Sequence, residues 1–546
     1  MTQLGKPPCD DAFIRAGDPA SGCAPSARRW VLVATIIGSS MAFIDGTIVN
    51  VALPSIQRDL GATAASMQWV VESYALFLAS LLLVGGALGD HFGRRRIFLI
   101  GVAIFAVASA ACAFSPDVNV LIIARALQGI GGALLVPGSL TLISASFPQE
   151  ERGRAIGTWS GFSGITAAIG PVIGGFLVDH YSWAWAFLIN IPLAAAVIWI
   201  GWRHVPESRG ASARPLDGWG ALLVTIGLAG VVYAFIEAPG RQWSSAAVVI
   251  ALVAGIAALA LFVNVEWRVR WPMIPLSLFR NHNFAGANLL TLWLYAALGG
   301  GLYFFPLNLI QVQGYSATAA GAALLPFIII MFMLSRWAGK LVDRFGARRP
   351  LVAGPTIAAA GFAMFAWPGI GGSYWMTFFP AVVVLGLGMA VTVAPLTTTV
   401  MNSIGEEMAG VASGVNNAVS RAAALLAIAI FGMVMAWAFD SGLDSRLAAM
   451  DVPHEVVEFL DGQRDKLAGA ALPDGAGESA AAELRQAIGM AYVAGFRWVM
   501  LLSAGLALLS ALGAWMLIDG KRNLTPSPQR RGGAEKSSAE KGNVKL

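Results

Sequence analysis

The sequence predicts an all-α integral membrane protein with fourteen transmembrane helices. Of its 546 residues, 12% are charged and 57% are hydrophobic, whereas a soluble chain carries about 25% charged residues. The sequence also contains an internal repeat, because two segments 253 residues apart share a pattern of glycine, aspartate and arginine. Together they predict two pseudo-symmetric six-helix bundles plus a central inserted helix pair, an order of 6+2+6.

Several classes of protein are excluded by the same composition. A soluble enzyme or a nucleic-acid-binding domain needs a charged surface, so no nucleic-acid partner is expected. Cys9, Cys23 and Cys112 are odd in number and lack metal-ligand spacing, which argues against a disulfide scaffold and a metal site. No GxxxxGK[ST] phosphate loop and no HExxH or GxSxG motif occurs. We therefore expect no enzyme and no cofactor, with an ion gradient as the energy source.

Fourteen apolar runs are long enough to cross a bilayer core of about 30 Å as helices. Their approximate limits are 30–53, 67–88, 97–115, 119–143, 155–178, 183–202, 218–238, 244–265, 284–308, 318–341, 350–368, 375–400, 408–438 and 495–518.

The distribution of basic residues predicts the orientation of the chain. Residues 1–29 are polar and precede a span too long for a signal-peptide core, so an uncleaved anchor is expected. With this tail in the cytoplasm, 27 of the 36 Lys and Arg residues fall on the inner side and 7 on the outer side. A multi-pass protein of the plasma membrane, the bacterial inner membrane, is expected, with residues 1–29 and the basic tail 519–546 both cytoplasmic.

The internal repeat divides the chain into two bundles. GALGDHFGRRR (86–96) follows the second span and GKLVDRFGARR (339–349) follows the tenth. Equivalent positions in two halves are typical of transporter folds. The expected units are a bundle at 30–202, a linker with two extra spans at 203–283, and a bundle at 284–518 that includes an outer loop at 439–494. Because both halves lie in one chain, a functional monomer is expected.

Five motifs give the chain a family resemblance over nearly its whole length. Residues 86–96 resemble the signature loop of the major facilitator superfamily. The chain also resembles the fourteen-span drug:proton antiporter branch of that superfamily in FIDGTIVNVALP (43–54), LIIARALQGIGGA (121–133), GFSGITAAIGPVIGGF (161–176) and WAWAFLINIP (183–192). The resemblance implies transport by alternating access, with a small-molecule substrate and protons as partners in a lipid bilayer.

The fifth-span motif bears on the direction of transport. In the superfamily it is similar to a motif typical of exporters, so the resemblance implies efflux. Physically, its glycines predict a flat face for close helix approach and its proline a bend. These antiporter-motif residues are Gly161, Gly164, Gly170, Pro171, Gly174 and Gly175. Two positions differ from relatives: Ala184 stands where an arginine is common, and Glu72 where a neutral residue is common.

Three ionisable residues lie within the predicted spans of the N-terminal bundle. A charge at bilayer depth costs about 2.5–3.5 kcal/mol and needs a partner or a function. At 1.5 Å per residue, Asp45, Glu72 and Arg125 lie roughly 12, 8 and 9 Å below the outer edge. We expect them to meet in a proton switch, in which a protonated carboxyl loses its link to Arg125. The family resemblance implies that Asp45 and Arg125 take part in proton coupling, whereas a role for Glu72 is inferred mainly from its estimated depth. The alternative is a static ion pair.

A conformational latch is expected at the cytoplasmic ends of the second and tenth spans. The Asp90 carboxylate can accept from amides at a helix N-terminus, and Arg94, Arg95 and Arg96 can reach acidic partners or lipid phosphates. The second half has a weaker form of this latch, in which Asp343 takes the place of Asp90.

Deeper residues of the C-terminal bundle are candidates for a substrate cavity. Aromatic side chains suit amphipathic organic molecules. The candidates are Trp293, Tyr295, Tyr303, Arg336, Asn416 and Arg421. Arg421 either faces the cavity or satisfies carbonyl groups.

The function expected from residues and resemblance is a proton-coupled antiporter that exports amphipathic drugs, dyes or toxic compounds. The alternatives are an exporter of one dedicated metabolite or siderophore and an importer or symporter of the same fold.

Overall fold

The computed structural model describes residues 25–210, 217–404, 408–450, 452–473 and 477–519, and within them every regular element is a helix. Thirteen of these helices are long and apolar enough to cross a membrane. A fourteenth, α14 (Arg348–Phe365), is less hydropathic but packs between α16 and α19. The fourteen-helix class predicted from the sequence is therefore confirmed. The expected tails 1–29 and 519–546 lie almost wholly outside the described residues.

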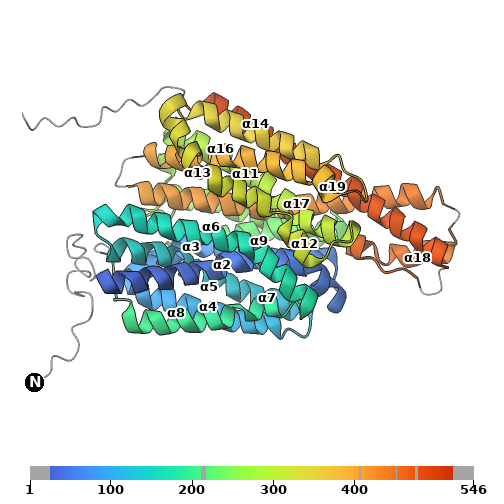
Figure 1. The fold of residues 1–546 in the computed structure, drawn as a ribbon, viewed down its shortest axis with the longest axis horizontal. Coiled ribbons are helices and arrows are strands. Elements are labelled where there is room, and N and C mark those ends of the chain that lie inside the picture. Colours follow the sequence, from blue (N-terminus) through green and yellow to red (C-terminus); the bar gives the residue numbers. More distant parts are fainter. Residues whose placement is uncertain (1–24, 211–216, 405–407, 451, 474–476, 520–546) are drawn as a thin grey trace, which may run out of the picture.

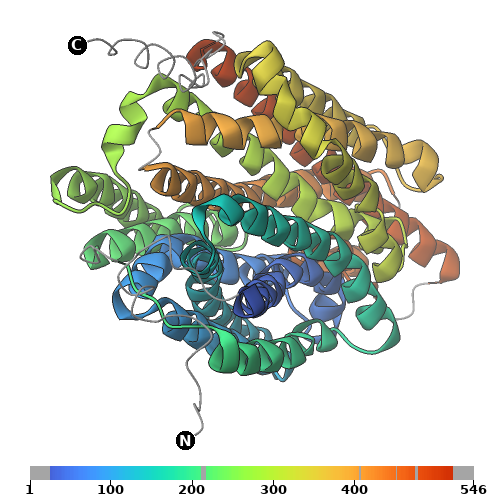
Figure 2. The same ribbon diagram turned by 60° about the vertical axis from the view of Figure 1, so that its left-hand side comes forward.

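Six spans form the N-terminal half, the blue to teal bundle of Figures 1 and 2. Asp117 accepts hydrogen bonds from Asn119 N and Val120 N, and Thr63 from Ser66 N, so side-chain caps start α5 and α3. The helices are α2 (Pro25–Asp59), α3 (Ala64–Phe92), α4 (Arg94–Ala113), α5 (Val118–Ser146), α6 (Gln149–His180), and α7 (Trp185–Leu188) with α8 (Asn190–His204).

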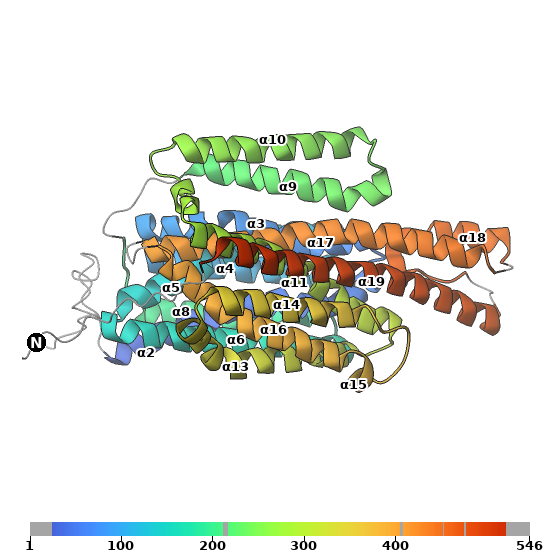
Figure 3. The ribbon, with the colours of Figure 1, turned by 90° about the horizontal axis from the view of Figure 1, so that it is seen from above.

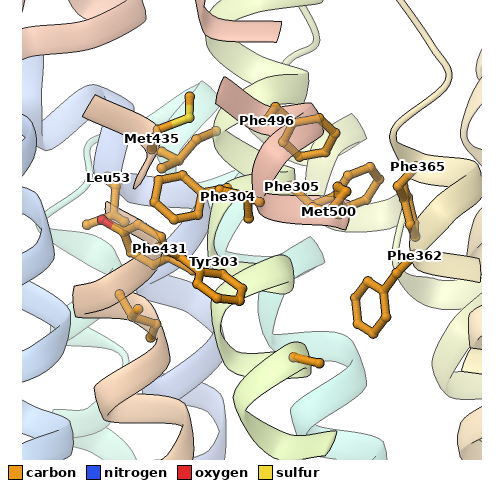
Figure 4. Close-up of a cluster of buried hydrophobic side chains, with 14 of the residues drawn as sticks. Leu53, Tyr303, Phe304, Phe305, Phe362, Phe365, Phe431, Met435, Phe496 and Met500 are labelled. Atoms are coloured by element: carbon orange, nitrogen blue, oxygen red, sulfur yellow. The ribbon is translucent and has the colours of Figure 1, made fainter. Parts of the chain in front are cut away.

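Six further spans form the C-terminal half. Its core is aromatic: Figure 4 shows Phe305 of α11 on the side of Phe365 of α14, with ring centres 4.9 Å apart, while Phe304 lies on the side of Phe431 of α17. The helices are α11 (His282–Leu307) continued by η2 (Asn308–Val312), α12 (Ala317–Ala322) with α13 (Leu325–Phe345), α14, α15 (Tyr374–Thr377) with α16 (Phe379–Asn402), α17 (Ala409–Leu447) and α19 (Glu478–Leu517).

The repeated segments adopt the same turn in both halves. Gly93 ends α3 with φ of 114°, and Gly346 ends α13 with φ of 77°. Both values lie where a side chain is strained, so glycine is needed at these two positions. The structural repeat thus matches the sequence repeat.

The inserted pair consists of α9 (Gly218–Arg241) and α10 (Ala246–Arg268), followed by η1 (Leu276–Arg280). Leu76 of α3, Val232 of α9 and Leu425 of α17 belong to one buried cluster, so α9 covers a seam between the two halves. The Trp69 Nε1 group donates to Glu237 Oε1 at 3.1 Å across the same contact. Helix α10 packs on α9 at the edge of the molecule (Figure 3).

Helices α17 and α19 run well past the limits predicted for their spans, and with α18 (His454–Asp461) they project from the bundle (Figure 1). We call this projection the hairpin end, and the opposite end, where Pro25 and Asp519 lie, the terminal end. The expected outer loop 439–494 is therefore largely helical. Leu443, Leu447, Leu484 and Ile488 are buried in the main core, because the apolar stripes of both helices continue beyond the hydropathic spans.

The two halves touch at the hairpin end of α6. Asp179 accepts from Ala317 N at 3.0 Å, from Thr318 N at 2.8 Å and from Thr318 Oγ1 at 2.6 Å, so a carboxylate of one half caps a helix of the other. Gly175 lies directly against the backbone of Ala317 and Thr318, and Gly321 against the Pro171 carbonyl.

Toward the terminal end the same helices diverge. Beyond the backbone of its own helix, no atom of the described residues lies within 4 Å of a Cβ built on Gly161, Gly164 or, on α13, Gly339. Close packing at Gly161 and Gly164 was expected and is wrong for this conformation, because toward the terminal end α6 contacts α2 and α5 through Ala155 and Trp159 and not through these two glycines. There Gly170 and Gly174 pack on α2.

A bulky side chain is therefore expected to act differently at the two ends of the motif. Gly175→Leu must push α6 away from the α12 backbone, which we expect to cost about 1–3 kcal/mol. Gly161→Leu meets open space and is expected to leave unfolding unchanged. Thermal unfolding of the purified variants in detergent measures both, and equal losses would contradict the divergence of the helices.

Candidate functional site

A buried ion pair lies at the centre of the N-terminal half. Asp45 of α2 is fully buried and Arg125 of α5 is 1% exposed. Arg125 Nη1 donates to Asp45 Oδ2 at 2.5 Å. A salt bridge this deep is sensitive to the loss of either partner, because the remaining charge would stay in a medium of low dielectric.

Neutral side chains complete the coordination of this pair. Gln128 Nε2 donates to Asp45 Oδ1 at 2.7 Å and to Ser109 Oγ at 2.8 Å, while Gln128 Oε1 accepts from Arg125 Nη1 at 2.6 Å. Asn190 Nδ2 reaches Ser109 Oγ at 3.3 Å and Asp45 Oδ1 at 3.5 Å, the long limit for a hydrogen bond. Residues of α2, α4, α5 and α8 thus form one network, which we call the Asp45 network.

The guanidinium of Arg125 is held on its remaining sides by α3. Its Nε donates to the Val70 carbonyl at 3.0 Å, and its carbon lies 4.3 Å from the centre of the Tyr74 ring. Tyr74 in turn donates from its hydroxyl to Ala42 O at 3.3 Å. Arg125 therefore has a fixed position, and a change of charge on Asp45 would act on helices α2, α3 and α5 together.

Sequence reasoning found the two charges and missed their neutral partners. Gln128 follows Arg125 by three residues, which places both on one helix face, and this spacing was a usable signal. Ser109 and Asn190 gave none, because small polar residues are common in spans and distance along the chain does not show which of them converge.

Glu72 does not join the Asp45 network, contrary to expectation. It is fully buried on α3, and neither carboxylate oxygen has a hydrogen-bond partner among the described residues. Its electrostatic neighbour is Tyr303 of α11, in the other half. The depth estimated from the sequence put Glu72 in the same layer as Asp45 and Arg125. Its side chain, however, projects from a different face of α3 than the residues that contact Arg125.

The candidate cavity residues of the C-terminal half do not form one lining. Tyr303 is 3% exposed and stacks edge-on against Phe304, and Asn416 Nδ2 donates to Thr291 Oγ1 at 2.7 Å within the half. Arg336 is exposed on α13, and Trp293 and Tyr295 are half-buried on α11.

Arg421 has a different environment from these residues. It is half-buried on α17, and its Nε atom has no partner in the described part of the chain. It interacts electrostatically with Tyr74, so it faces the Asp45 network from the opposite half.

The latch at the terminal end is arranged differently from the expectation. Asp90 Oδ1 accepts from Arg94 Nε at 2.8 Å, whereas the amides at the start of α4 are capped by Glu207. Glu207 Oε1 accepts from Arg95 N at 3.0 Å and Oε2 from Arg96 N at 3.1 Å. The capping role assigned to Asp90 thus belongs to a residue that follows the sixth span.

The remaining latch residues differ between the halves. The Arg95 guanidinium donates to Val205 O at 3.0 Å, while the Arg96 side chain is exposed. Asp343 is exposed on α13 and has no ion pair within the described ranges. The two repeats therefore share a turn and differ in how their charges are bound.

Comparison with known proteins supports a transporter. The family model described as Major Facilitator Superfamily matches residues 35–428. Multidrug resistance protein Stp of Mycobacterium tuberculosis (strain H37Rv) is 37% identical over 422 residues, which is 76% of this chain and 77% of the relative. Tetracenomycin C resistance and export protein of Streptomyces glaucescens is 36% identical over 428 residues, with coverages of 77% and 78%.

Solved structures show the same fold. A bacterial homologue of the human lysosomal transporter Spinster, in an inward-facing and unoccupied conformation, matches with a TM-score of 0.62 at 17% identity and covers 90% of this chain and 97% of its own. The xylose transporter XylE from E. coli, in an inward-open conformation, matches with a TM-score of 0.54 at 14% identity, with coverages of 91% and 96%.

The buried pair predicts a strong coupling between two substitutions. Arg125→Met leaves the Asp45 carboxylate buried without its cation, so we expect a loss of about 3–5 kcal/mol in the free energy of unfolding. Adding Asp45→Asn removes that charge and is expected to restore most of the loss. A double-mutant cycle on unfolding in detergent measures the coupling. Additive effects would show that the two side chains do not depend on each other.

The capping role of Glu207 gives a second prediction. Glu207→Gln weakens two hydrogen bonds to the start of α4, and we expect it to lower the free energy of unfolding by about 0.5–2 kcal/mol. The matched control is Glu151→Gln, because Glu151 is 56% exposed in its ion pair with Arg28 and should contribute little. Equal effects in the same unfolding measurement would remove the distinction between the two carboxylates.

Proposed function

The chain belongs to the Major Facilitator Superfamily, and from this premise we propose that it is a proton-coupled antiporter that exports amphipathic organic molecules. The observation that carries the proposal is the Asp45–Arg125 pair, a fully buried carboxylate whose charge is balanced by one fixed cation. Relatives that are named for multidrug resistance and for antibiotic export support the direction and the class of substrate.

The positive-inside distribution of Lys and Arg supports an orientation with the terminal end in the cytoplasm. In that orientation the contacts between Asp179 and α12 close the outer side. The open space beside Gly161 and Gly164 then lies on the cytoplasmic side, so the conformation is inward-facing.

A transport cycle follows from the charge state of Asp45. With Asp45 ionised, its pair with Arg125 is intact, as in this structure, which corresponds to the state after proton release. A substrate entering from the cytoplasm favours closure of α6 on α13 and opening at Asp179. Protonation of Asp45 from outside then neutralises the carboxylate and weakens its bond to Arg125. The protonated form returns to the inward-facing state.

Glu72 has a separate place in this proposal. It is buried toward Tyr303 of the other half, so a positively charged group between the halves would find an unpartnered carboxylate there. We assign it to substrate recognition or to a second proton, and Asp45 to the coupling proton.

One observation favours a dedicated exporter as a second candidate. Several relatives are named for a single compound, among them puromycin resistance protein pur8 of Streptomyces alboniger, 36% identical over 78% of this chain and 84% of its own. The same fold and coupling would then serve one metabolite.

Transport in inside-out vesicles tests the coupling. With an imposed pH gradient, wild-type protein is expected to move a fluorescent cationic dye and to release protons in step, because Asp45 must be protonated and deprotonated in each cycle. Asp45→Asn is expected to lose gradient-driven transport. Asp117→Asn is the matched control, since Asn retains the exposed cap of α5 and leaves transport unchanged.

The outcomes separate the candidates. Full gradient-driven transport by folded Asp45→Asn would contradict the role of Asp45, and a simultaneous loss in Glu72→Gln would move the coupling to Glu72. No movement of any dye by folded wild-type protein, with proton release on addition of one metabolite, would favour the dedicated exporter.

A further inference from the structure

Two carboxyl groups meet where the inserted helix pair closes at the terminal end. Asp217 caps α9, and its Oδ1 accepts from Gly220 N at 2.7 Å. Glu266 lies in the last turn of α10, is 2% exposed, and accepts from Ile274 N through Oε2 at 2.9 Å. Each carboxyl group thus has one oxygen bound to a backbone amide.

The other two oxygens face each other. Asp217 Oδ2 and Glu266 Oε1 are buried and have no hydrogen-bond donor among the described residues. A Cβ built on Gly220 would lie 2.6 Å from the first oxygen and 2.8 Å from the second, so both border the same small space. The two side chains are within hydrogen-bonding reach of each other. Two acceptors in this position can form a hydrogen bond only if a proton lies between them.

No cation in the described surroundings balances the pair. The elements around Glu266 are α9, α10 and the connection 269–275, and the charged group that acts on it from them is Asp217. Arg268 and Arg270 follow on the same stretch, but both are exposed, and Arg270 lies over the Trp271 ring. Two carboxylates in contact and out of water cannot both stay ionised.

We propose that Asp217 and Glu266 form a proton-binding site that is distinct from the Asp45 network and holds one shared proton. A divalent cation takes six or more oxygen ligands, whereas two free carboxyl oxygens border this small buried space, and the described residues contain no cluster of three or more His, Cys, Asp or Glu side chains. The ligand is therefore a proton.

The shared proton joins three segments of the chain. It links the start of α9 to the end of α10, and Glu266 also holds Ile274 on the connection that leads through η1 into α11. Loss of the proton places two negative charges in contact and opens this end of the inserted pair. The site thus senses the pH on the terminal side and changes how firmly the pair is tied to the C-terminal half.

Infrared spectroscopy of the full chain in lipid nanodiscs tests for the proton. The C=O stretch of a protonated carboxyl is recorded while the pH is raised, in an Asp45→Asn, Glu72→Gln background, because Asp45 and Glu72 are also buried carboxyl groups. The band is expected to be present at neutral pH, to disappear at higher pH, and to be lost completely in Asp217→Asn and in Glu266→Gln. Glu237→Gln, on α9 beside Arg241, is the matched control and keeps the band.

Unfolding gives a second readout with a defined sign. A proton that the folded state holds more tightly than the unfolded state stabilises the fold at low pH, and this contribution is lost as the pH rises through the titration of the pair. Wild-type protein should show this decrease. Glu266→Gln should not, because its Nε2 group can donate to Asp217 Oδ2 at every pH and so also preserves the fold.

Three results would overturn the proposal. They are a band that survives both substitutions, a decrease of stability with pH that is the same in Glu266→Gln, and a wild-type site stabilised by added Mg²⁺ or Ca²⁺ with no carboxyl band. The test does not depend on transport, so it stands apart from the vesicle experiment on Asp45.

Discussion

The structure of the N-terminal half depends on one buried ion pair, Asp45 and Arg125. Removing these two charges from water costs free energy. The cost of desolvation is offset only if both charges are paired and their remaining hydrogen-bonding positions are filled. Gln128 and Ser109 supply those contacts, and Tyr74 covers the guanidinium. Because the contributing residues come from five of the helices, the pair fixes the relative positions of the helices and makes the half a single body sensitive to one charge.

The contacts between the halves have another character. They include glycine against backbone at Gly175, a carboxylate cap at Asp179 and the apolar seam under α9. Such contacts can separate without leaving a buried charge behind. Alternating access requires rigid halves whose mutual contacts can separate. A change of charge inside one half can then alter the contacts that this half makes with the other.

Much of the fold could be predicted because hydropathy and the repeat report directly on spans and their order. The projecting hairpin could not be predicted from hydropathy. Its sequence is more polar than that of a membrane span, although Leu443 and Ile488 continue the buried apolar stripes of α17 and α19. Depth placed Asp45, Glu72 and Arg125 in one layer but could not give the direction in which each side chain leaves its helix. Asn190 and Glu207 were missed because their partners are distant in sequence. Gln128 lies three residues after Arg125 and could have been found from that spacing, and the open space at Gly161 depends on the conformational state.

The central claim is that protonation of Asp45 favours the inward-facing conformation. Spin labels at exposed Ser160 on α6 and Lys340 on α13 report the separation of these helices at the terminal end through pulsed electron paramagnetic resonance. In wild-type protein, lowering the pH should increase the population with the longer distance. Asp45→Asn should hold the longer distance at every pH. A distance distribution in Asp45→Asn that still shifts with pH as the wild type does would contradict the account.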